Sequence, residues 1–135
     1  MENCVFCKII KGEIPCYKLY EDNYTLSFLD ISNDGEGHAL VIPKQHVNDI
    51  VACDEQTLVH VMKTVKKISA HYLENCDFDG VNVFNNCKES AGQTVMHLHF
   101  HILPRKNGDV IEKWNIDGKH GKKLEDLQKL YKITE

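Results

Sequence analysis

His97-Leu98-His99-Phe100-His101-Ile102-Leu103 alternates histidines with apolar residues. Successive side chains of a β-strand point to opposite faces, so this alternation predicts a strand with three imidazoles on one face and an apolar face turned to the core. We expect the strand to cover residues 95–103 and to end at Pro104. The three histidines would then form a row on a rigid support.

A row of imidazoles suits catalysis or metal binding. Imidazole titrates near neutral pH, so it can transfer protons, and its neutral form is a good nucleophile. It is also a common zinc ligand, and a merely polar sheet face is the third interpretation. Three histidines in strict alternation, in a chain with eight histidines in total, favour catalysis.

The residues before the histidine strand favour phosphate as the group acted upon. Gly92 lets the backbone approach a ligand closely, and Gln93 and Thr94 can donate hydrogen bonds to phosphate oxygens. Asn86, in the preceding polar loop, offers another donor. Such residues are also common in ordinary turns, so it is their position next to the histidines that gives them weight.

The rest of the chain predicts an α+β fold. Short apolar segments bounded by turn residues predict four further strands, at residues 17–20, 24–30, 38–42 and 81–84. Apolar residues at helical spacing after Asp54 predict a long helix with Asp54 as its N-cap, and shorter helices are expected at 4–10 and within 121–134. Strands joined by short turns favour an antiparallel sheet with the helices on one face.

The bulk composition bounds the kind of protein. A length of 135 residues and a hydrophobic fraction of 42% predict a single domain over residues 1–135. The formal net charge of −4 provides no broad basic surface, so neither nucleic acid nor a membrane is an expected partner. No segment is apolar enough to span a bilayer, and the first residues lack the pattern of a secretory signal. We therefore expect a cytoplasmic protein, also nuclear if its source is eukaryotic, whose cysteines are reduced or bound to metal.

Cys4 and Cys7 have the Cys-x-x-Cys spacing that lets two thiolates bind one metal ion. Two other interpretations are a pair of buried thiols in a short helix and a redox pair. No thioredoxin-like sequence surrounds the two cysteines, which disfavours the redox interpretation. The spacing favours a structural zinc site, and a closed zinc site needs two more ligands from elsewhere in the chain.

Residues 97–103 resemble the signature of the histidine-triad (HIT) family, in which three histidines alternate with apolar residues. The stretch Gly92-Gln93-Thr94-Val95 and the segments 4–10 and 37–46 are similar to the Hint branch, the histidine-triad nucleotide-binding proteins. The resemblance covers residues 4–105 and leaves the tail, 106–135, outside it. It implies a five-stranded antiparallel sheet with helices packed on it, assembled as a homodimer with a continuous sheet.

The resemblance implies hydrolysis of purine nucleoside 5′-phosphoramidates, such as AMP joined to an amine. His99 would be the nucleophile that forms a transient nucleotidyl-histidine, His101 would assist the leaving group, and His38 would orient His99. The implied nucleotide contacts are Asp30 to the ribose, Ile31 and Phe28 to the base, and Asn86, Gln93, Thr94, His99 and His101 to the α-phosphate.

The same resemblance implies how the zinc site would be completed. Some bacterial-type members bind zinc through positions that match Cys4, Cys7, His46 and His97 here. This would assign His97 to structure, although as the first histidine of the row it is also a candidate catalytic residue.

Two features leave other functions open. Thr94 stands where the family often has serine, and Trp114 precedes a lysine-rich tail unlike the short tail of some Hint proteins. These two features leave open which amine or leaving group is preferred. Cleavage of dinucleoside polyphosphates, as in the Fhit branch, is the nearest alternative, although Gln93, Thr94 and the N-terminal cysteines favour the Hint branch. A nucleotide-binding regulatory dimer is an alternative of another class, and transfer to phosphate or a sugar phosphate is less favoured.

Overall fold

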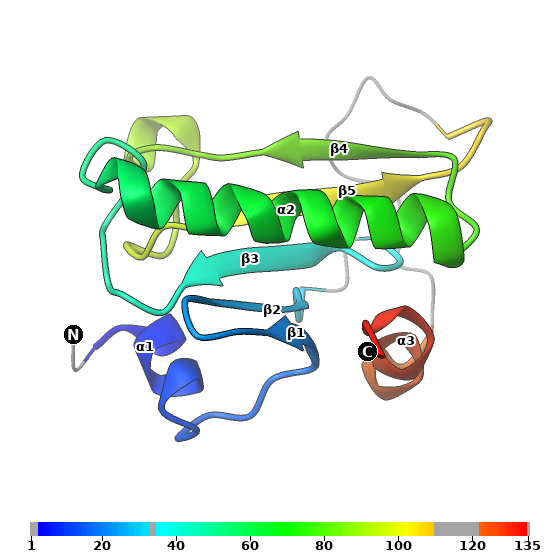
Figure 1. The fold of residues 1–135 in the computed structure, drawn as a ribbon, viewed down its shortest axis with the longest axis horizontal. Helices are drawn as coiled ribbons and strands as arrows, with labels where there is room; N and C mark the ends of the chain where they lie inside the picture. Colours follow the sequence, from blue (N-terminus) through cyan, green and yellow to red (C-terminus); the bar gives the residue numbers. More distant parts are fainter. Residues whose placement is uncertain (1–2, 33–34, 110–121, 135) are drawn as a thin grey trace.

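The structure, a computed structural model, describes residues 3–32, 35–109 and 122–134. Its five strands form one antiparallel sheet in the order β1-β2-β3-β5-β4, which confirms the predicted α+β fold (Figure 1). Along the chain the elements are α1 (Val5–Ile10), β1 (Lys18–Glu21), β2 (Thr25–Leu29), β3 (Ala39–Pro43), α2 (Glu55–Asn75), β4 (Gly80–Phe84), the 3-10 helix η1 (Glu89–Ala91), β5 (Phe100–Arg105) and α3 (Leu124–Tyr131).

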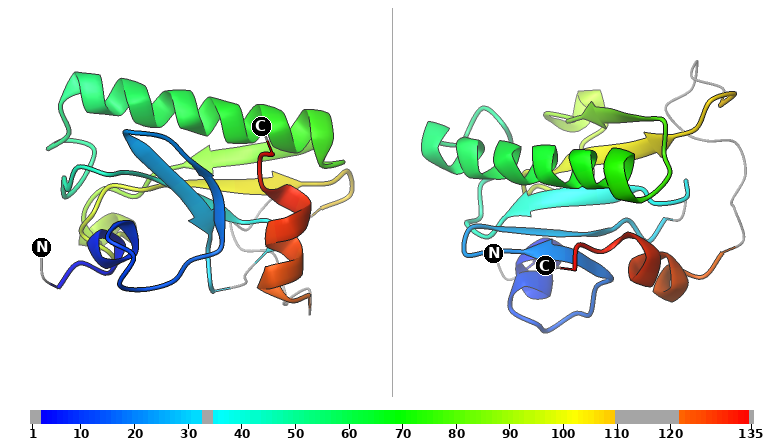
Figure 2. Two further views of the ribbon diagram at one scale, coloured as in Figure 1. Left: turned by 60° about the horizontal axis from the view of Figure 1, so that its bottom comes forward. Right: turned by 45° about the vertical axis from the view of Figure 1, so that its right-hand side comes forward.

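The helices lie on both faces of the sheet, whereas the sequence predicts them on one. The long helix α2 covers one face, and α1 packs on the opposite face (Figure 2). All residues of β2 and β3 are buried, so both faces of the central sheet are covered. Phe6 of α1 packs with Phe28 and Leu40 in the smaller of two core clusters.

The helix α2 forms as the sequence predicts. The Asp54 side chain accepts a hydrogen bond from the backbone N–H of Thr57 at 3.0 Å, which caps the first turn. Val61, Ile68 and Tyr72 recur at helical spacing and are fully buried against the sheet. Among the described residues, no helix is long and apolar enough to cross a membrane.

The histidine-bearing strand begins later than the predicted strand over 95–103. Because β5 covers Phe100–Arg105, His101 is the one histidine of the three that lies within it. The backbone gives one reason, since the N–H of Leu98 donates to the oxygen of Val47 at 2.8 Å, and Val47 lies beyond the end of β3. The apolar residues between the histidines still pack toward α2, so the predicted separation of the two faces holds.

Pro104 lies inside β5 rather than ending the strand. The backbone N–H of Asp79 donates to the oxygen of Arg105, so the backbone groups of Arg105 face β4 and those of Pro104 face the other way. On that other side, β3 pairs with β5 only as far as Ile102. The missing N–H of Pro104 therefore costs no hydrogen bond of the sheet.

The predicted C-terminal helix is α3, which packs against β1. The side-chain amide of Gln128 donates to the oxygen of Lys18, and the backbone N–H of Ile133 donates to the oxygen of Leu19. Leu127 is buried in the same core cluster as α2. Trp114 lies outside the described residues.

Candidate active site and metal centre

His99 lies immediately before β5, on the face of the sheet that α1 covers. Its ring is 6% exposed and meets the edge of Phe6 at a centroid distance of 5.2 Å. Because Nδ1–H donates to the oxygen of His97, the proton of the neutral ring is on Nδ1 and Nε2 carries a lone pair. Burial lowers the pKa of His99 below its ordinary value, which favours this neutral form.

His101 lies in β5, opposite Phe84 of β4. The two rings stack with centroids 4.5 Å apart and an angle of 7° between planes. Nδ1 of His101 is 2.9 Å from Nε2 of His38, and Nδ1 of His38 is 3.8 Å from a carboxylate oxygen of Asp30. Burial lowers the pKa of His101 to about 4. A line of polar groups therefore runs from Asp30 through His38 to His101.

The family resemblance implies that His38 orients His99. Nε2 of His38 lies 2.9 Å from Nδ1 of His101, and its role toward His99 stays a prediction. The His99 and His101 rings are themselves adjacent, with centroids 5.1 Å apart. The arrangement places a nucleophilic nitrogen beside an imidazole that is backed by a second imidazole and a carboxylate. Such a pair can attack an electrophile with one ring and move the proton of the leaving group with the other.

The predicted phosphate-binding residues lie in the loop between β4 and β5, and Gln93 holds that loop together. Its side-chain oxygen accepts from the backbone N–H of Lys88, and both amide hydrogens are engaged by the oxygens of Asn48 and Val95, at 2.7 and 3.0 Å. Gln93 is 3% exposed. Direct phosphate binding by Gln93 stays a prediction, and the structure gives its amide a loop-forming role.

The other predicted residues of this loop are Gly92, Asn86 and Thr94. Gly92 has a φ of +97°, and a Cβ there would lie 3.5 Å from the Asn86 side-chain nitrogen, so the loop brings these two residues together. Thr94 is exposed and lines an open pocket beside Cys4 and His46.

The predicted ribose and base contacts are near the end of β2. Asp30 follows β2 and accepts from the backbone N–H of Ser32 in addition to facing His38. Ile31 is 76% exposed, whereas Phe28 is buried against Phe6 with ring centroids 5.6 Å apart. The roles of all three in nucleotide binding stay predictions.

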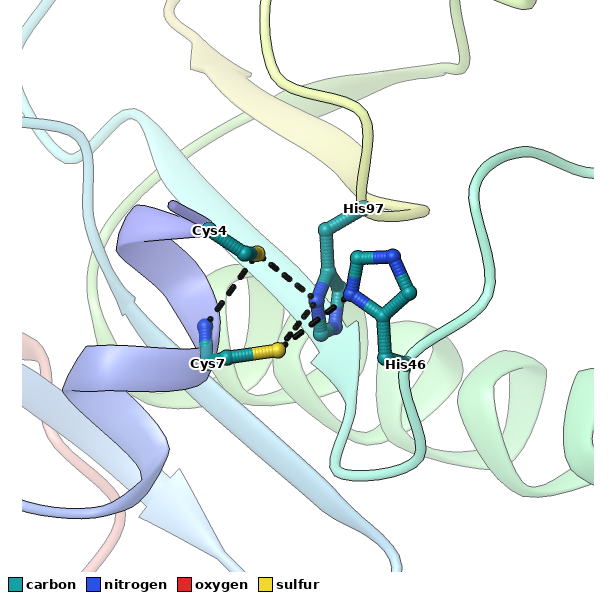
Figure 3. Close-up of side chains that lie close together, drawn as sticks. All are labelled: Cys4, Cys7, His46 and His97. Atoms are coloured by element: carbon teal, nitrogen blue, oxygen red, sulfur yellow. Dashed lines mark hydrogen bonds between the residues drawn. The ribbon is translucent and has the colours of Figure 1, made fainter. Parts of the chain in front are cut away.

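The four predicted zinc ligands converge, although they come from three separate parts of the chain (Figure 3). Nδ1 of His97 is 3.3 Å from Sγ of Cys4 and 3.6 Å from Sγ of Cys7, and Nδ1 of His46 is 3.2 Å from Sγ of Cys7. Sulfur and nitrogen ligands of a tetrahedral zinc ion are separated by about 3.6 Å. The spacing of the four side chains therefore fits one metal ion.

The outer nitrogens of both histidines support the same conclusion. Nε2–H of His97 donates to the backbone oxygen of Pro43 at 2.9 Å, and Nε2 of His46 lies 3.0 Å from the side-chain oxygen of Asn48. With Nε2 of each histidine next to an oxygen, the Nδ1 lone pair of each ring points toward the sulfurs. Metal-bound histidines commonly have this arrangement, in which the nitrogen that does not bind the metal forms a hydrogen bond to an oxygen. Cys4, Cys7, His46 and His97 thus form a group that can hold a metal.

Three residues of the site could not be singled out from the sequence. Phe6 lies between the two cysteines and touches both His97 and His99. Phe84 stacks on His101, and the side-chain amide of Asn85 donates to the oxygen of His99 at 2.9 Å. The roles of Phe84 and Asn85 depend on which residues of β4 and β5 face each other, and the sequence carries no clear signal for that register.

Comparison with known proteins points to one family. A profile of the HIT domain family matches residues 11–108. A Schizosaccharomyces pombe protein named adenosine 5′-monophosphoramidase is 41% identical over 105 residues, which cover 78% of this chain and 76% of that protein. An Arabidopsis thaliana protein named adenylylsulfatase is 37% identical over 123 residues, which cover 91% of this chain and 62% of that protein.

A solved structure extends the likeness to the fold. The crystal structure of a Zn-bound histidine triad family protein from Mycobacterium smegmatis matches with a TM-score of 0.85 and 34% identity, covering 96% of this chain and 91% of that one. The family profile also spans most of the chain and includes all three histidines of the row. This chain belongs to the HIT family.

Proposed function

We propose that this protein hydrolyses nucleoside 5′-phosphoramidates, cleaving the P–N bond between a purine nucleotide such as AMP and an amine. The observation that carries the proposal is the environment of His99, whose Nδ1–H is fixed by the oxygen of His97 and whose ring is neutral. Nε2 is then available as a nucleophile beside His101. The relative named adenosine 5′-monophosphoramidase supports this choice of substrate.

The reaction would proceed in two displacements at the α-phosphorus. In the first, Nε2 of His99 attacks phosphorus, the bond from phosphorus to the amine breaks, and the amine leaves with a proton from His101. In the second, His101 takes a proton from water, whose oxygen attacks phosphorus and breaks its bond to His99. The nucleotide is released and both histidines return to their starting states.

The line from Asp30 to His101 would supply the proton for the first step. As His101 gives the proton on Nε2 to the amine, its Nδ1 can accept one from Nε2 of a protonated His38, 2.9 Å away. The Asp30 carboxylate, 3.8 Å from Nδ1 of His38, would stabilise the positive charge on that ring. His101 can therefore act as an acid even though burial lowers its own pKa. In the second step, as Nε2 of His101 takes the proton from water, its Nδ1 returns a proton to Nε2 of His38, so that ring also regains its starting state.

Replacing His99 with alanine tests this mechanism. We expect His99→Ala to abolish turnover of AMP joined to an amine, because no other described side chain has the same fixed lone pair beside His101. His60→Ala is the matched control, since His60 lies on α2, stacked on Tyr24 and on the other side of the sheet from the site. Wild-type kcat in the His99→Ala variant would disprove the mechanism.

Two further substrates, tested beside the phosphoramidate, would separate the alternative activities. Attack of His99 on an α-phosphorus is compatible with other leaving groups, and one relative is named adenylylsulfatase. Comparing kcat/KM on an AMP phosphoramidate, adenosine 5′-phosphosulfate and diadenosine triphosphate ranks the three, and we expect the phosphoramidate to be highest. Tight AMP binding without turnover of any of them would favour a regulatory dimer instead.

We also propose that the metal held by Cys4, Cys7, His46 and His97 is zinc in a structural role. Two thiolates and two imidazoles in tetrahedral spacing are a typical zinc ligand set, and four protein ligands leave no open position for substrate. Bound zinc would fix α1, and with it Phe6, against His99. The Zn-bound relative supports the choice of metal.

Metal analysis tests the zinc proposal. Protein purified without chelators should contain about one zinc per chain, and Cys7→Ser should lose most of it and unfold at lower temperature. Cys53→Ser is the control, because Cys53 lies before α2 and outside the cluster. Wild-type zinc below about a tenth of an equivalent would refute the proposal.

Finally, we propose a homodimer with a continuous sheet joined through β4. That strand is an edge of the sheet, and the opposite edge strand, β1, is covered by α3. Val83 in β4 is 41% exposed, and a second copy of β4 paired along this edge would cover it.

A further inference from the structure

The turn that leads into His38 is bonded to the C-terminal helix. The hydroxyl of Tyr131, on α3, donates to one carboxylate oxygen of Glu36, and Nζ of Lys122 lies 2.9 Å from the other. Glu36 precedes His38 by two residues. A helix from the far end of the sequence therefore contacts the segment that carries a histidine of the site.

Glu36 is held strongly by these two contacts. Burial opposes ionisation of its carboxyl, but the hydrogen bonds from Tyr131 and Lys122 more than offset burial and lower the pKa of Glu36. Burial and the Glu36 charge raise the pKa of Tyr131, so its hydroxyl stays protonated and remains a donor. The pair is thus an ionised acceptor with a neutral donor, the stronger kind of hydrogen bond.

The residue between Glu36 and His38 has little room to move. Gly37 is buried with a φ of +83°, and a Cβ there would lie 3.0 Å from Pro104 and 3.4 Å from the Tyr131 ring. Its oxygen accepts a hydrogen bond from the Tyr72 hydroxyl at 2.6 Å. The turn is therefore packed on both sides, and a shift at Tyr131 would pass to His38.

The helix α3 is itself anchored by contacts that do not involve the turn. Nε2–H of His71 donates to the backbone oxygen of Tyr131 at 2.9 Å, and Gln128 and Ile133 bond to β1. The Tyr131 ring also packs on Tyr72, with centroids 5.7 Å apart. Tyr131 is thus held in place by contacts other than its bond to Glu36, so that bond can fix the position of the Glu36 carboxylate.

We propose that Tyr131 is a positioning residue for the His38–His101 pair and acts through Glu36. The His38–His101 hydrogen bond is 2.9 Å long, and a movement of the turn by a fraction of an ångström would weaken it. Its effect on turnover rests on the proposed function, but its effect on the two imidazoles does not.

Tyr131→Phe tests the proposal, since it keeps the packed ring and removes only the hydroxyl. We expect kcat on an AMP phosphoramidate to fall about three- to tenfold with KM nearly unchanged, because a displaced His101 delays proton transfer more than binding. Leu130→Ala, an exposed neighbour on α3, is the matched control and should leave both constants at wild-type values. Glu36→Ala removes the acceptor of the Tyr131 hydroxyl and should resemble Tyr131→Phe, and the double variant should lose no more than Glu36→Ala alone.

An imidazole NMR spectrum separates this proposal from the proposed function. In ¹⁵N-labelled protein, Tyr131→Phe should shift the ring nitrogens of His38 and His101, assigned from His38→Gln and His101→Gln, while those of His46 stay in place. This shift is expected even if the wild-type protein turns over none of the substrates. If Tyr131→Phe fails to fold, the spectrum of Glu36→Ala, which lacks the acceptor oxygen, tests the same bond. Unshifted His38 and His101 signals in a folded variant would overturn the proposal.

Discussion

His99 and His101 are two residues apart and turn to the same face, but their neighbours give them different properties. His99 donates its one ring proton to a backbone oxygen, which leaves a single lone pair at Nε2. His101 faces His38, a second titratable ring, with Asp30 behind it. At the scale of the residue, chemistry is therefore divided between a nucleophile that cannot easily give a proton and a partner that can exchange one.

The pH dependence of turnover follows from the burial of His99. Burial disfavours the imidazolium, so the pKa of His99 in the folded protein lies below its ordinary value of 6.5. Protonation removes the attacking lone pair, so kcat/KM should fall with decreasing pH through a midpoint below 6.5. A pH profile of kcat/KM measures this midpoint, and a value at or above 6.5 would contradict the assigned environment.

The sequence predicts which residues meet, but less about which atoms bond. The alternation of histidines places the imidazoles on one face, and the Cys-x-x-Cys spacing and the family resemblance bring four ligands together. The bond from His38 to His101 depends on side-chain rotation, and so does the use of both Gln93 amide hydrogens within the loop. Those choices are set by packing among distant segments, which spacing along the chain does not encode.

At the scale of the element, the helices follow local rules and the strands do not. The cap at Asp54 and the apolar spacing of α2 are local features, so its start was predicted correctly. The bounds of β5 depend on its neighbours, because β3 pairs with it only from Phe100 to Ile102. Strand limits are set by pairing across the sheet, which explains why β5 continues through Pro104, where the sequence alone predicts its end.

Removing the N-cap of α2 tests whether this local interaction stabilises the helix. We expect Asp54→Ala to lower the free energy of unfolding by about 1 kcal/mol, because the N–H of Thr57 loses its acceptor. Asp54→Asn keeps an acceptor oxygen and should lose much less. Urea denaturation of both variants measures the difference, and equal losses would show that the carboxylate charge, and not the cap, stabilises the helix.

At the scale of the whole molecule, the two faces of the sheet carry different groups of residues. The face under α2 holds the larger core cluster, while the face under α1 holds the histidines and the metal ligands. Phe6 links the metal group to His99, and α3 links the C-terminal end to the turn before His38. Both α1 and α3 therefore contact the site or the segment that leads into it.

The proposed dimer makes a prediction at this scale. Light scattering should give twice the chain mass of 15.5 kDa, and Val83→Asp should reduce it toward the monomer by placing a charge on the joining strand. Val51→Asp is the control, because Val51 is 79% exposed in the loop before α2. A wild-type monomer, or a dimer unaffected by Val83→Asp, would rule out pairing through β4.

The most direct test of the central claim is to trap the intermediate on His99. Protein mixed with AMP joined to an amine is quenched during turnover, digested and examined by mass spectrometry. The proposed mechanism predicts one adenylyl group on the peptide that contains residues 97–103, attached at His99 and absent from His99→Ala. Turnover by the wild-type protein with no adenylylated histidine, or with the group on another residue, would contradict it.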